Sequence, residues 1–375
     1  MKQLRSAAPI LATGLSFLAL VTLLGMVGAA IYTLNSFNHQ GAVGTVIGAA
    51  LVCLVLGPRL LLGPVDGSSS GWRSRFRRLL GPARKALIVV LACWLGLIGW
   101  SKVSPGGPMP APKTEPSSIR VVTWNILHGE EGRPPWDRLT LSNWPGRKDA
   151  LQTALRHAGP DILCVQEACA GQVAFLEQVL PTHRRVGVGR DDGRAAGEHC
   201  AIYFDADRFE QLGGDTFWLE EPTDQPRGGS VLKVKRICTW VRLRDQASGR
   251  TFRVYNVHSY LTERSRVAAA QVVLDHLKTG DPADAIILAG DFNAPPGAPS
   301  RRLFAAAGLA DSAEQAGRRA DTPTYQWYGL RIRCLDGILV SPDWRVCHHR
   351  LLDVKPGNTY PSDHFGILAD LAFRE

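Results

Sequence analysis

The chain has 375 residues, enough for one large domain and a further segment, and its formal net charge is +9. The excess lies in residues 1–118, which hold 11 basic and 2 acidic residues, whereas residues 119–375 hold 32 of each. The neutral C-terminal part gives no charge-based support for a nucleic-acid surface, and the absence of a Cys-x-x-Cys pair among the eight cysteines argues against a zinc site.

The first 100 residues are predicted to be a membrane region. No charged side chain occurs between Arg5 and Arg59. The apolar stretches predicted to cross a bilayer as helices are 7–34, 41–62 and 86–101. A signal peptide would have a shorter apolar core, so we expect the first stretch to remain as an uncleaved span.

The basic residues predict how this region is oriented. Residues 59–85, between the second and third stretches, carry seven basic residues and one acidic residue. The positive-inside rule places this loop and the N-terminus in the cytoplasm. Three crossings then put everything after Trp100 on the extracytoplasmic side, and two crossings would leave it in the cytoplasm. Residues 101–118 contain five prolines and are expected to be a semi-extended tether.

Residues 119–375 alternate between strand-like and helix-like patterns, which favours a four-layer α/β sandwich with two mainly antiparallel sheets. The expected strands are Ile119–Ile126, Asp161–Gln166, Arg185–Arg190, Cys200–Asp205, Phe209–Leu219, Arg236–Arg244, Thr251–His258, Ala285–Ala289, Gly337–Val340, Val346–Val354 and His364–Leu371. The expected helices are Pro145–His157, Gly171–Leu180, Thr262–Lys278 and Ser300–Ala307.

The most informative stretch is Ile286–Pro296, where an apolar strand runs into Gly-Asp-Phe-Asn. Alternation along an extended chain would put Asp291 and Asn293 on one face. An anionic acceptor beside an amide could hold a water molecule or a phosphoryl oxygen. A strand end followed by an Asx-type turn explains the same residues without chemistry.

Other polar residues follow or precede apolar strands. Asn125 ends the strand Ile119–Ile126, and Glu167 follows Asp-Ile-Leu-Cys-Val-Gln. Burying such a carboxylate costs free energy unless it is paired or binds a cation, so Glu167 is either a helix cap or an oxygen ligand to Mg²⁺. His258 ends Val-Tyr-Asn-Val-His, and a lone histidine is more often structural than catalytic.

Two more carboxylates open apolar strands near the C-terminus. Asp336 begins Asp-Gly-Ile-Leu-Val, and Asp363 and His364 begin the last strand. A carboxylate placed against His364 would fix its tautomer and raise its basicity, which is a recurring arrangement in acid–base catalysis.

Six motifs together resemble the endonuclease/exonuclease/phosphatase superfamily, which includes deoxyribonuclease and neutral sphingomyelinases. They are Thr-Trp-Asn-Ile, Val-Gln-Glu, Asn-Val-His, Gly-Asp-Phe-Asn, Leu-Asp-Gly-Ile and Ser-Asp-His, and they stand in the family's order. The resemblance covers Ile119 to Phe373 and implies metal-dependent phosphoester hydrolysis, with Mg²⁺ or alternatively Mn²⁺. Thr216–Pro222 and Arg236–Leu243 resemble a bacterial-type subgroup, which implies the cytoplasmic membrane of a bacterium.

The resemblance implies roles for these residues. It implies that Glu167, Asn125 and Asp363 lie on the metal-binding side of the site, with Glu167 as the principal metal ligand. It implies catalytic roles for Asp291 and Asn293 (water and phosphate), Asp336 and His364 (imidazole dyad) and His258 (leaving oxygen). Arg236 and Arg266 are candidates for phosphate contacts, and structural ion pairs are an equal alternative for both.

The sequence therefore predicts an integral membrane, metal-dependent phosphoesterase acting on a lipid or small-molecule phosphodiester or phosphomonoester. An extracytoplasmic nuclease is the alternative within the same chemistry. A membrane-tethered binding module without catalysis is the rival from another class, although every expected position is filled.

Overall fold

The computed structural model describes residues 92–93, 95–96, 99–101, 103–113, 115–129, 143–226 and 234–375. The predicted membrane stretches 7–34 and 41–62, and most of 86–101, lie outside these residues. Within the described ranges, no helix combines the length and apolar character that a bilayer crossing requires. Trp100–Arg133 and Leu141–Glu375 form one compact unit, and this unit contains both sheets of the fold.

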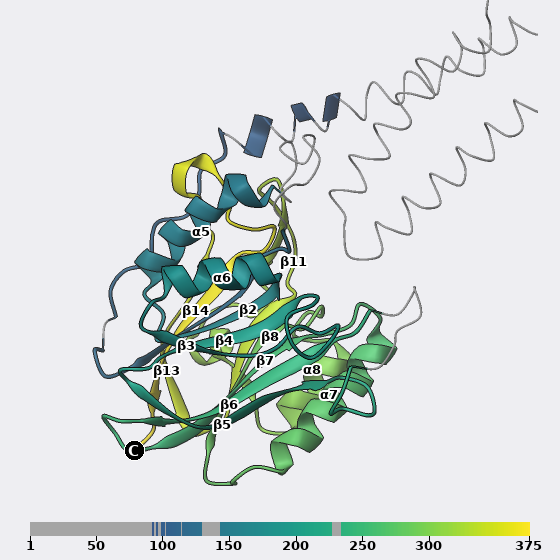
Figure 1. Ribbon diagram of the computed structural model, residues 1–375. Coiled ribbons are helices and arrows are strands. Elements are labelled where there is room, and N and C mark those ends of the chain that lie inside the picture. The colour runs from purple at the N-terminus through teal and green to yellow at the C-terminus, as the bar shows by residue number, and fades with distance from the viewer. Residues whose placement is uncertain are drawn as a thin grey trace, which may run out of the picture. The chain divides into compact units, whose positions relative to one another are not determined.

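Two six-stranded mixed sheets form the centre of the unit (Figure 1). The first has the order β13-β14-β1-β2-β4-β3, and its strands are β1 (Ile119–Asn125), β2 (Ile162–Ala168), β3 (His183–Val186), β4 (His199–Asp205), β13 (Trp344–Leu352) and β14 (Gly366–Phe373). The second has the order β5-β6-β7-β8-β12-β9, and its strands are β5 (Phe209–Trp218), β6 (Ile237–Asp245), β7 (Thr251–His258), β8 (Ala285–Asp291), β9 (Ala310–Asp311) and β12 (Asp336–Val340).

Each sheet contains one parallel pair, β1 with β2 and β7 with β8, and the neighbours of these pairs run antiparallel. The prediction of mainly antiparallel sheets is therefore confirmed in outline, and the parallel pair at the centre of each sheet is an addition to it.

Both faces of the central strands are buried, which explains their nearly continuous apolar sequences. In β1, Ile119 and Val121 point into the core between the two sheets, where they join Val254 and Ile287 of the second sheet. The alternate residues of β1 belong instead to a core shared with helices α5 (Trp144–Ala158) and α6 (Ala170–Val179). The period of two along the strand thus separates an inner layer from an outer one.

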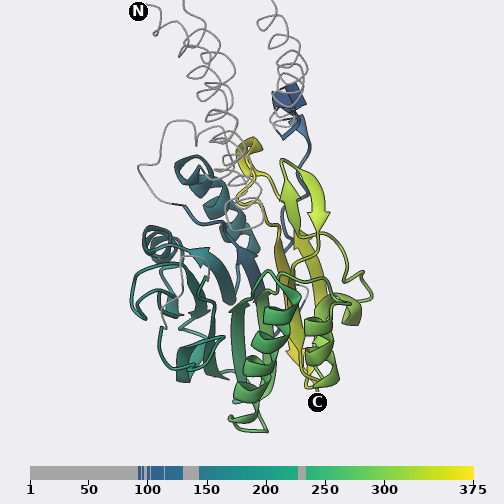
Figure 2. The ribbon, with the colours of Figure 1, turned by 90° about the vertical axis from the view of Figure 1, so that its right-hand side faces the viewer.

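Helices cover the outer faces of both sheets, which completes the layers of the expected α/β sandwich (Figure 2). They are α5 (Trp144–Ala158) and α6 (Ala170–Val179) on the first sheet, and α7 (Glu263–Lys278) and α8 (Pro299–Ala306) on the second. A short helix α9 (Ser312–Gln315), a 3-10 turn η2 (Pro356–Asn358) and a hairpin of β10 (Tyr325–Trp327) and β11 (Leu330–Arg333) complete the described elements.

One expected strand is mostly wrong. The sequence predicted a strand over Arg185–Arg190, whereas β3 ends at Val186. Gly187 then takes a φ of 126°, which an L residue rarely adopts, and the chain leaves the sheet for a series of turns. The β10–β11 hairpin was not predicted, because its strands are only three and four residues long.

Part of the Pro-rich stretch lies against the domain. The Gly107 amide donates to the Asp353 carbonyl at 2.9 Å, and the Arg345 guanidinium binds both carboxylate oxygens of Glu115 at 2.7 and 2.9 Å. The seven cysteines in the described residues are free thiols, so no disulfide joins them.

Candidate active site

The polar residues expected at strand ends meet at one edge of the two sheets. Asn125, His258 and Asp291 are the last residues of β1, β7 and β8, and Glu167 is the last but one of β2. Strand β12 runs antiparallel to β8 and begins at Asp336, which pairs with Asp291. Parallel strands end where their antiparallel neighbours begin, so side chains far apart in the chain converge here.

The Asn125 amide joins the two sheets at this edge. Its nitrogen donates to Glu167 Oε1 at 2.9 Å and to Asp291 Oδ2 at 3.0 Å, and its oxygen accepts from the Leu127 amide at 3.0 Å. One side chain therefore spaces two carboxylates that belong to different sheets. In this orientation Asn125 positions the carboxylates, and it would have to turn its amide to offer oxygen to a metal.

Glu167 is held as a carboxylate. Its backbone has a φ of 64°, and its Oε2 accepts from the His128 amide at 3.1 Å and lies 3.2 Å from the ring Nδ1 of the same histidine. Burial opposes ionisation, but the His128 contact and the nearby His258 and Asn125 outweigh it and hold the pKa of Glu167 well below its usual value. Metal ligation requires this deprotonated form.

His364 forms the expected dyad with Asp336. Its Nδ1 lies 2.8 Å from Asp336 Oδ2, and the Thr324 hydroxyl donates to the same oxygen. The Tyr325 ring contacts the imidazole edge to face at 5.1 Å between centroids. Burial works against a charged imidazole, but Asp336 and the neighbouring carboxylates more than compensate and raise the pKa of His364 well above its usual value.

Two imidazoles converge on Asp291. His258 Nε2 lies 3.5 Å and His364 Nε2 4.0 Å from Asp291 Oδ2. Burial, and then the charge of Asp336, raise the pKa of Asp291 to about 7. Burial, and then the charge of Arg236, lower the pKa of His258 well below its usual value, which disfavours the imidazolium form.

Three residues near the site were not among those singled out from the sequence. The His258 Nδ1 lies 4.0 Å from Glu198, and Arg190 binds both oxygens of Glu198 at 2.6 and 2.9 Å. Arg190 and Glu198 lie in the turns after β3; Arg190 was expected to end a strand, and Glu198 stood in no predicted element. His128 stands three residues after Asn125, just beyond the motif Thr-Trp-Asn-Ile, and this closeness was the one available signal.

Asn293 forms the Asx-type turn that was the alternative interpretation of its motif. Its backbone N–H donates to Asp291 Oδ1 at 2.8 Å, and this bond closes the Asx-type turn. Its side-chain amide donates to the Ser259 carbonyl at 3.0 Å. Strand β8 ends at Asp291 and Asn293 has a φ of 51°, so the argument from alternation along an extended chain was wrong. Arg266 pairs with Glu263 and donates to the Asn293 carbonyl at 2.9 Å, and so supports this turn from behind.

Asp363 lies in a loop that is fixed to β1. Ser362 donates to the Asn125 carbonyl at 2.7 Å and accepts from the His364 amide at 3.1 Å. Burial raises the pKa of Asp363, the charge of His364 opposes this, and the charge of Glu167 adds to it. The charge of Glu167 therefore acts on the carboxyl group of Asp363.

Arg236 brings a buried positive charge to the site. The side chain is 1% exposed, and burial, together with the charge of Arg190, lowers its pKa to about 10. The carboxylates of Glu198, Glu167 and Asp291 act in the opposite direction, which places the guanidinium in their field. The structure thus brings Arg236 to the site, whereas Arg266 acts through Asn293.

These residues suit a divalent cation. Carboxylate oxygens are the preferred ligands of Mg²⁺, and burial is the main cause of the raised pKa values of Asp291 and Asp363, with neighbouring carboxylates adding to it. Glu167 and Asp363 lie on the side of the first sheet. Ligand atoms of Asp291, Asp336 and His364 also lie within 4.8 Å of one another.

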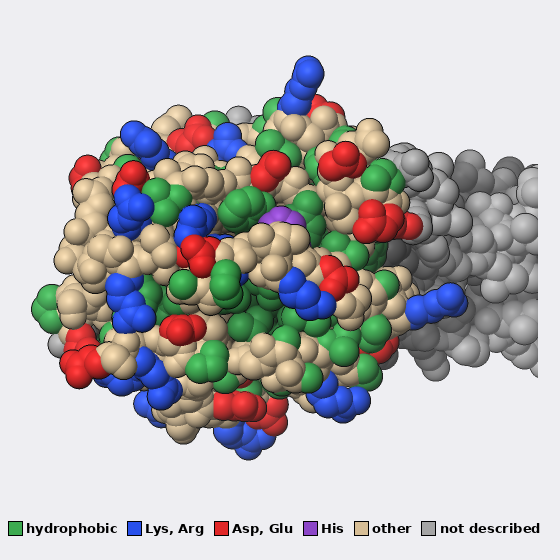
Figure 3. All heavy atoms as spheres, turned by 90° about the horizontal axis from the view of Figure 1, so that it is seen from below, with side chains coloured by type: hydrophobic (Ala, Val, Ile, Leu, Met, Phe, Trp, Pro, Cys, Tyr) green, Lys and Arg blue, Asp and Glu red, His purple; other side chains and the backbone are tan. Residues whose placement is uncertain are grey.

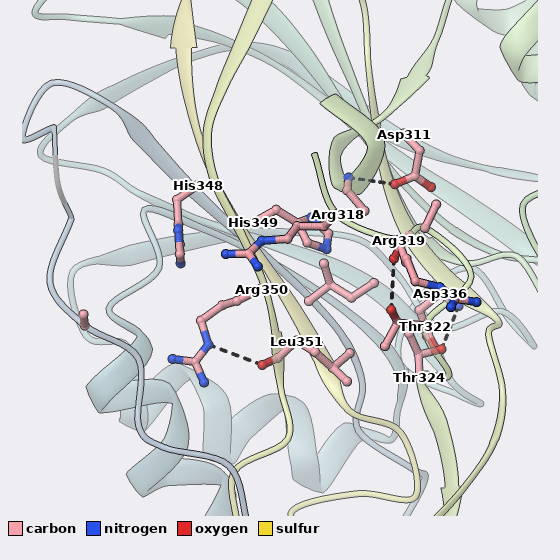
Figure 4. Close-up of a pocket in the computed structure, with 15 residues that line it drawn as sticks. Asp311, Arg318, Arg319, Thr322, Thr324, Asp336, His348, His349, Arg350 and Leu351 are labelled. Atoms are coloured by element: carbon pink, nitrogen blue, oxygen red, sulfur yellow. Dashed lines mark hydrogen bonds between the residues drawn. The ribbon is translucent and has the colours of Figure 1, made fainter. Parts of the chain in front are cut away.

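A separate cavity of about 430 Å³ lies behind Asp336 (Figure 4). Side chains of β13, among them His349 and Arg350, line it together with Thr324 and Arg318. Of the site residues described above, only Asp336 and its partner Thr324 reach this cavity.

The structure is thus a pair of mixed sheets covered by helices, with a carboxylate–amide–imidazole cluster at one edge. The model of the Endonuclease/Exonuclease/phosphatase family matches residues 122–364, more than half of the chain, and the chain belongs to this family. The suspected superfamily is thereby confirmed.

Individual relatives are distant. Nocturnin of Xenopus laevis is 25% identical over 304 residues, which cover 70% of this chain and 74% of Nocturnin. The solved structure of a mannosyl-6-phosphatase from Bacteroides thetaiotaomicron VPI-5482 is 27% identical, has a TM-score of 0.62, and covers 68% of this chain and 100% of its own. A family protein from Bacteroides thetaiotaomicron is 28% identical, with a TM-score of 0.61, and covers 70% of this chain and 100% of its own.

Proposed function

We propose that the protein is a membrane-anchored, Mg²⁺-dependent phosphoester hydrolase that acts on a lipid or small-molecule phosphoester. One observation carries the proposal: the Asn125 amide contacts both Glu167 and Asp291 and so makes one site from the two sheets. A bound divalent ion would neutralise phosphate charge and lower the pKa of a bound water. Glu167 and Asp363 would hold it, with Mn²⁺ as an alternative.

The chain's own residues supply positioning and hydrogen bonds. Asp291 is the acceptor that two imidazoles approach, so it is placed to orient the attacking water and accept its proton. His364, fixed by Asp336 through Nδ1, presents Nε2 to a phosphoryl oxygen. His258 faces the same space and is assigned to the leaving oxygen, with Arg236 stabilising the anion from behind.

The substrate assignment rests on charge and on the apolar N-terminal stretches. Residues 119–375 have no net charge. On the face seen in Figure 3, basic and acidic side chains are interspersed, and nucleic-acid binding usually depends on a basic stripe. The structural relative named as a mannosyl-6-phosphatase acts on a small phosphoester, which supports the same class here.

We place the domain on the extracytoplasmic side of a bacterial cytoplasmic membrane, because of the basic residues in 59–85. A reporter that is active only in the cytoplasm, fused after Glu375, should be silent. An active reporter would assign the domain to the cytoplasm.

A phosphoester panel tests the function with the purified full chain. We expect hydrolysis with Mg²⁺, none with EDTA, and at least a hundredfold loss in Glu167→Gln and in His364→Ala, with exposed Ser248→Ala as the control. Plasmid nicking with strongly salt-dependent DNA binding, and no cleavage of small esters, would favour the nuclease. No hydrolysis of any ester would favour a binding module.

A further inference from the structure

The β10–β11 hairpin borders the candidate active site. Its first residue, Tyr325, forms an isolated antiparallel bridge with His364, and the two rings are in contact. The preceding residue, Thr324, donates to Asp336. The base of the hairpin therefore lies directly beside the imidazole of His364.

The hairpin has an inner and an outer face. On the inner face, fully buried Gln326 donates to the Ser362 carbonyl at 2.8 Å, and the Arg331 guanidinium lies 5.2 Å from the centre of the Phe365 ring. Alternate residues of a strand point to opposite faces. Leu330 and Ile332 accordingly point outward, and they are 42% and 47% exposed.

The hairpin turn lies next to the point where the chain enters the domain. A Cβ at Gly329 would be 3.2 Å from the Ser104 hydroxyl, and Lys355 Nζ donates to the Ser104 carbonyl at 2.7 Å. Figure 2 shows the hairpin beside this part of the chain. Trp100 and Val103 are 49% and 76% exposed.

Trp100 closes the apolar stretch 86–101. Trp100 and Val103, just before Ser104, and Leu330 and Ile332 on the hairpin are all exposed apolar side chains. Arg331 and Arg333 alternate with Leu330 and Ile332 along β11 and so point to the opposite face, where both are exposed and Arg331 pairs with Asp353 at 2.6 Å. Their long side chains can reach anionic head groups at the border of the apolar face. Apolar side chains with basic neighbours suit the interface of an anionic bilayer.

We propose that the outer face of the β10–β11 hairpin contacts the lipid bilayer in which the N-terminal stretches are embedded. The contact holds the active site at the membrane surface, so the substrate is a phosphoester in the head group of a lipid. This inference rests on the proposed function for its substrate, but the membrane contact can be tested without any catalysis.

The first experiment measures contact. The full chain is reconstituted in vesicles of phosphatidylcholine and phosphatidylglycerol, and two cysteine variants are labelled with a membrane-impermeant maleimide. Ile332→Cys should react at least tenfold more slowly than Ala247→Cys, which is exposed in the turn between β6 and β7 at the end of β7 away from the site. Equal rates would overturn the contact. If Ile332→Cys is still labelled slowly after transfer of the protein to amphipol, and the protein is then a dimer, the surface would be assigned to a second copy of this chain.

The second experiment measures hydrolysis by the same vesicle-bound chain. Release of the lipid head group, divided by hydrolysis of soluble bis-p-nitrophenyl phosphate, should fall at least tenfold in Leu330→Asp/Ile332→Asp and stay unchanged in Ala247→Asp. Cleavage of the soluble ester without any lipid turnover would overturn the substrate assignment. If no ester is cleaved while Ile332→Cys stays protected, the proposed function fails and the membrane contact stands.

Discussion

Arg147 gives the sharpest prediction, because one buried guanidinium holds both loops of the metal side. The residue lies on α5 and is 2% exposed. Its two terminal nitrogens donate to four backbone carbonyls, those of Ile126 at 2.6 Å, Leu127 at 2.5 Å, His128 at 3.4 Å and Pro361 at 2.8 Å. The first three follow β1, and the fourth precedes Asp363.

Replacing Arg147 with Met removes these bonds and leaves buried carbonyls without donors. Hydrogen bonds from a charged donor contribute about 1.5–3 kcal/mol each, but they are not additive, and removing the cation also removes its own desolvation cost. We therefore expect a loss of about 3–5 kcal/mol in the free energy of unfolding. For a domain of this size that lowers Tm by roughly 10 °C.

The assay combines calorimetric unfolding with titration of Mg²⁺. Because Arg147 sets the loop that follows Asn125 and the loop that carries Asp363, affinity for Mg²⁺ should fall about 10–100-fold in the same variant. Arg156→Met is the matched control, since Arg156 is an exposed residue of the same helix. A Tm for Arg147→Met within 2 °C (roughly 1 kcal/mol) of this control would refute the reasoning.

Three further outcomes are expected. Asp336→Asn should lower kcat for a soluble phosphodiester about 10²–10⁴-fold, since His364 loses its anionic partner, and a loss below about threefold would contradict the dyad. Glu167→Gln should weaken Mg²⁺ binding in calorimetry by at least about tenfold, and unchanged affinity would assign the ion to other residues. The third outcome concerns pH. Burial, and then the charges of His348 and Arg318, lower the pKa of half-buried His349 to about 4. The unfolded chain therefore binds the proton first, and about 3 kcal/mol of stability, complete above pH 6.5, should be lost as the pH falls from 6.5 to 4. In His349→Gln the midpoint of urea unfolding should no longer fall between pH 6.5 and 4. An unchanged pH dependence of this midpoint would exclude His349 as its source.

The sequence predicted those parts of the fold in which local pattern and burial agree. Apolar runs such as Ala285–Ala289 are buried on both faces, and their period and length are sufficient to identify strands. Prediction from the sequence was wrong or incomplete where a local turn or a tertiary contact determines the structure. Arg185–Arg190 has a strand-like composition, but Gly187 turns the chain away after Val186. The β10–β11 hairpin is stabilised by Gln326 against Ser362, a contact between residues 36 positions apart.

The site shows the same division. Asn125, Glu167, Asp291 and Asp336 stand out because a polar residue at the end of an apolar strand is costly unless it has a use. Glu198 lies in a loop, where a carboxylate is unremarkable, and only the fold brings it to 4.0 Å from His258.

Strand direction explains why the motifs take two forms. In β1 and β8 the polar residue, Asn125 or Asp291, follows the apolar run, because these strands point toward the site. In β12 and β14 the polar residues, Asp336 and His364, precede the apolar run, because these strands are antiparallel to β8 and β1 and lead away from the site. A set of polar residues that all follow their strands would fit a purely parallel sheet. The presence of both forms in the sequence therefore indicates strands of both directions at the site. The position of the polar residue relative to its apolar run thus predicts the direction of each strand.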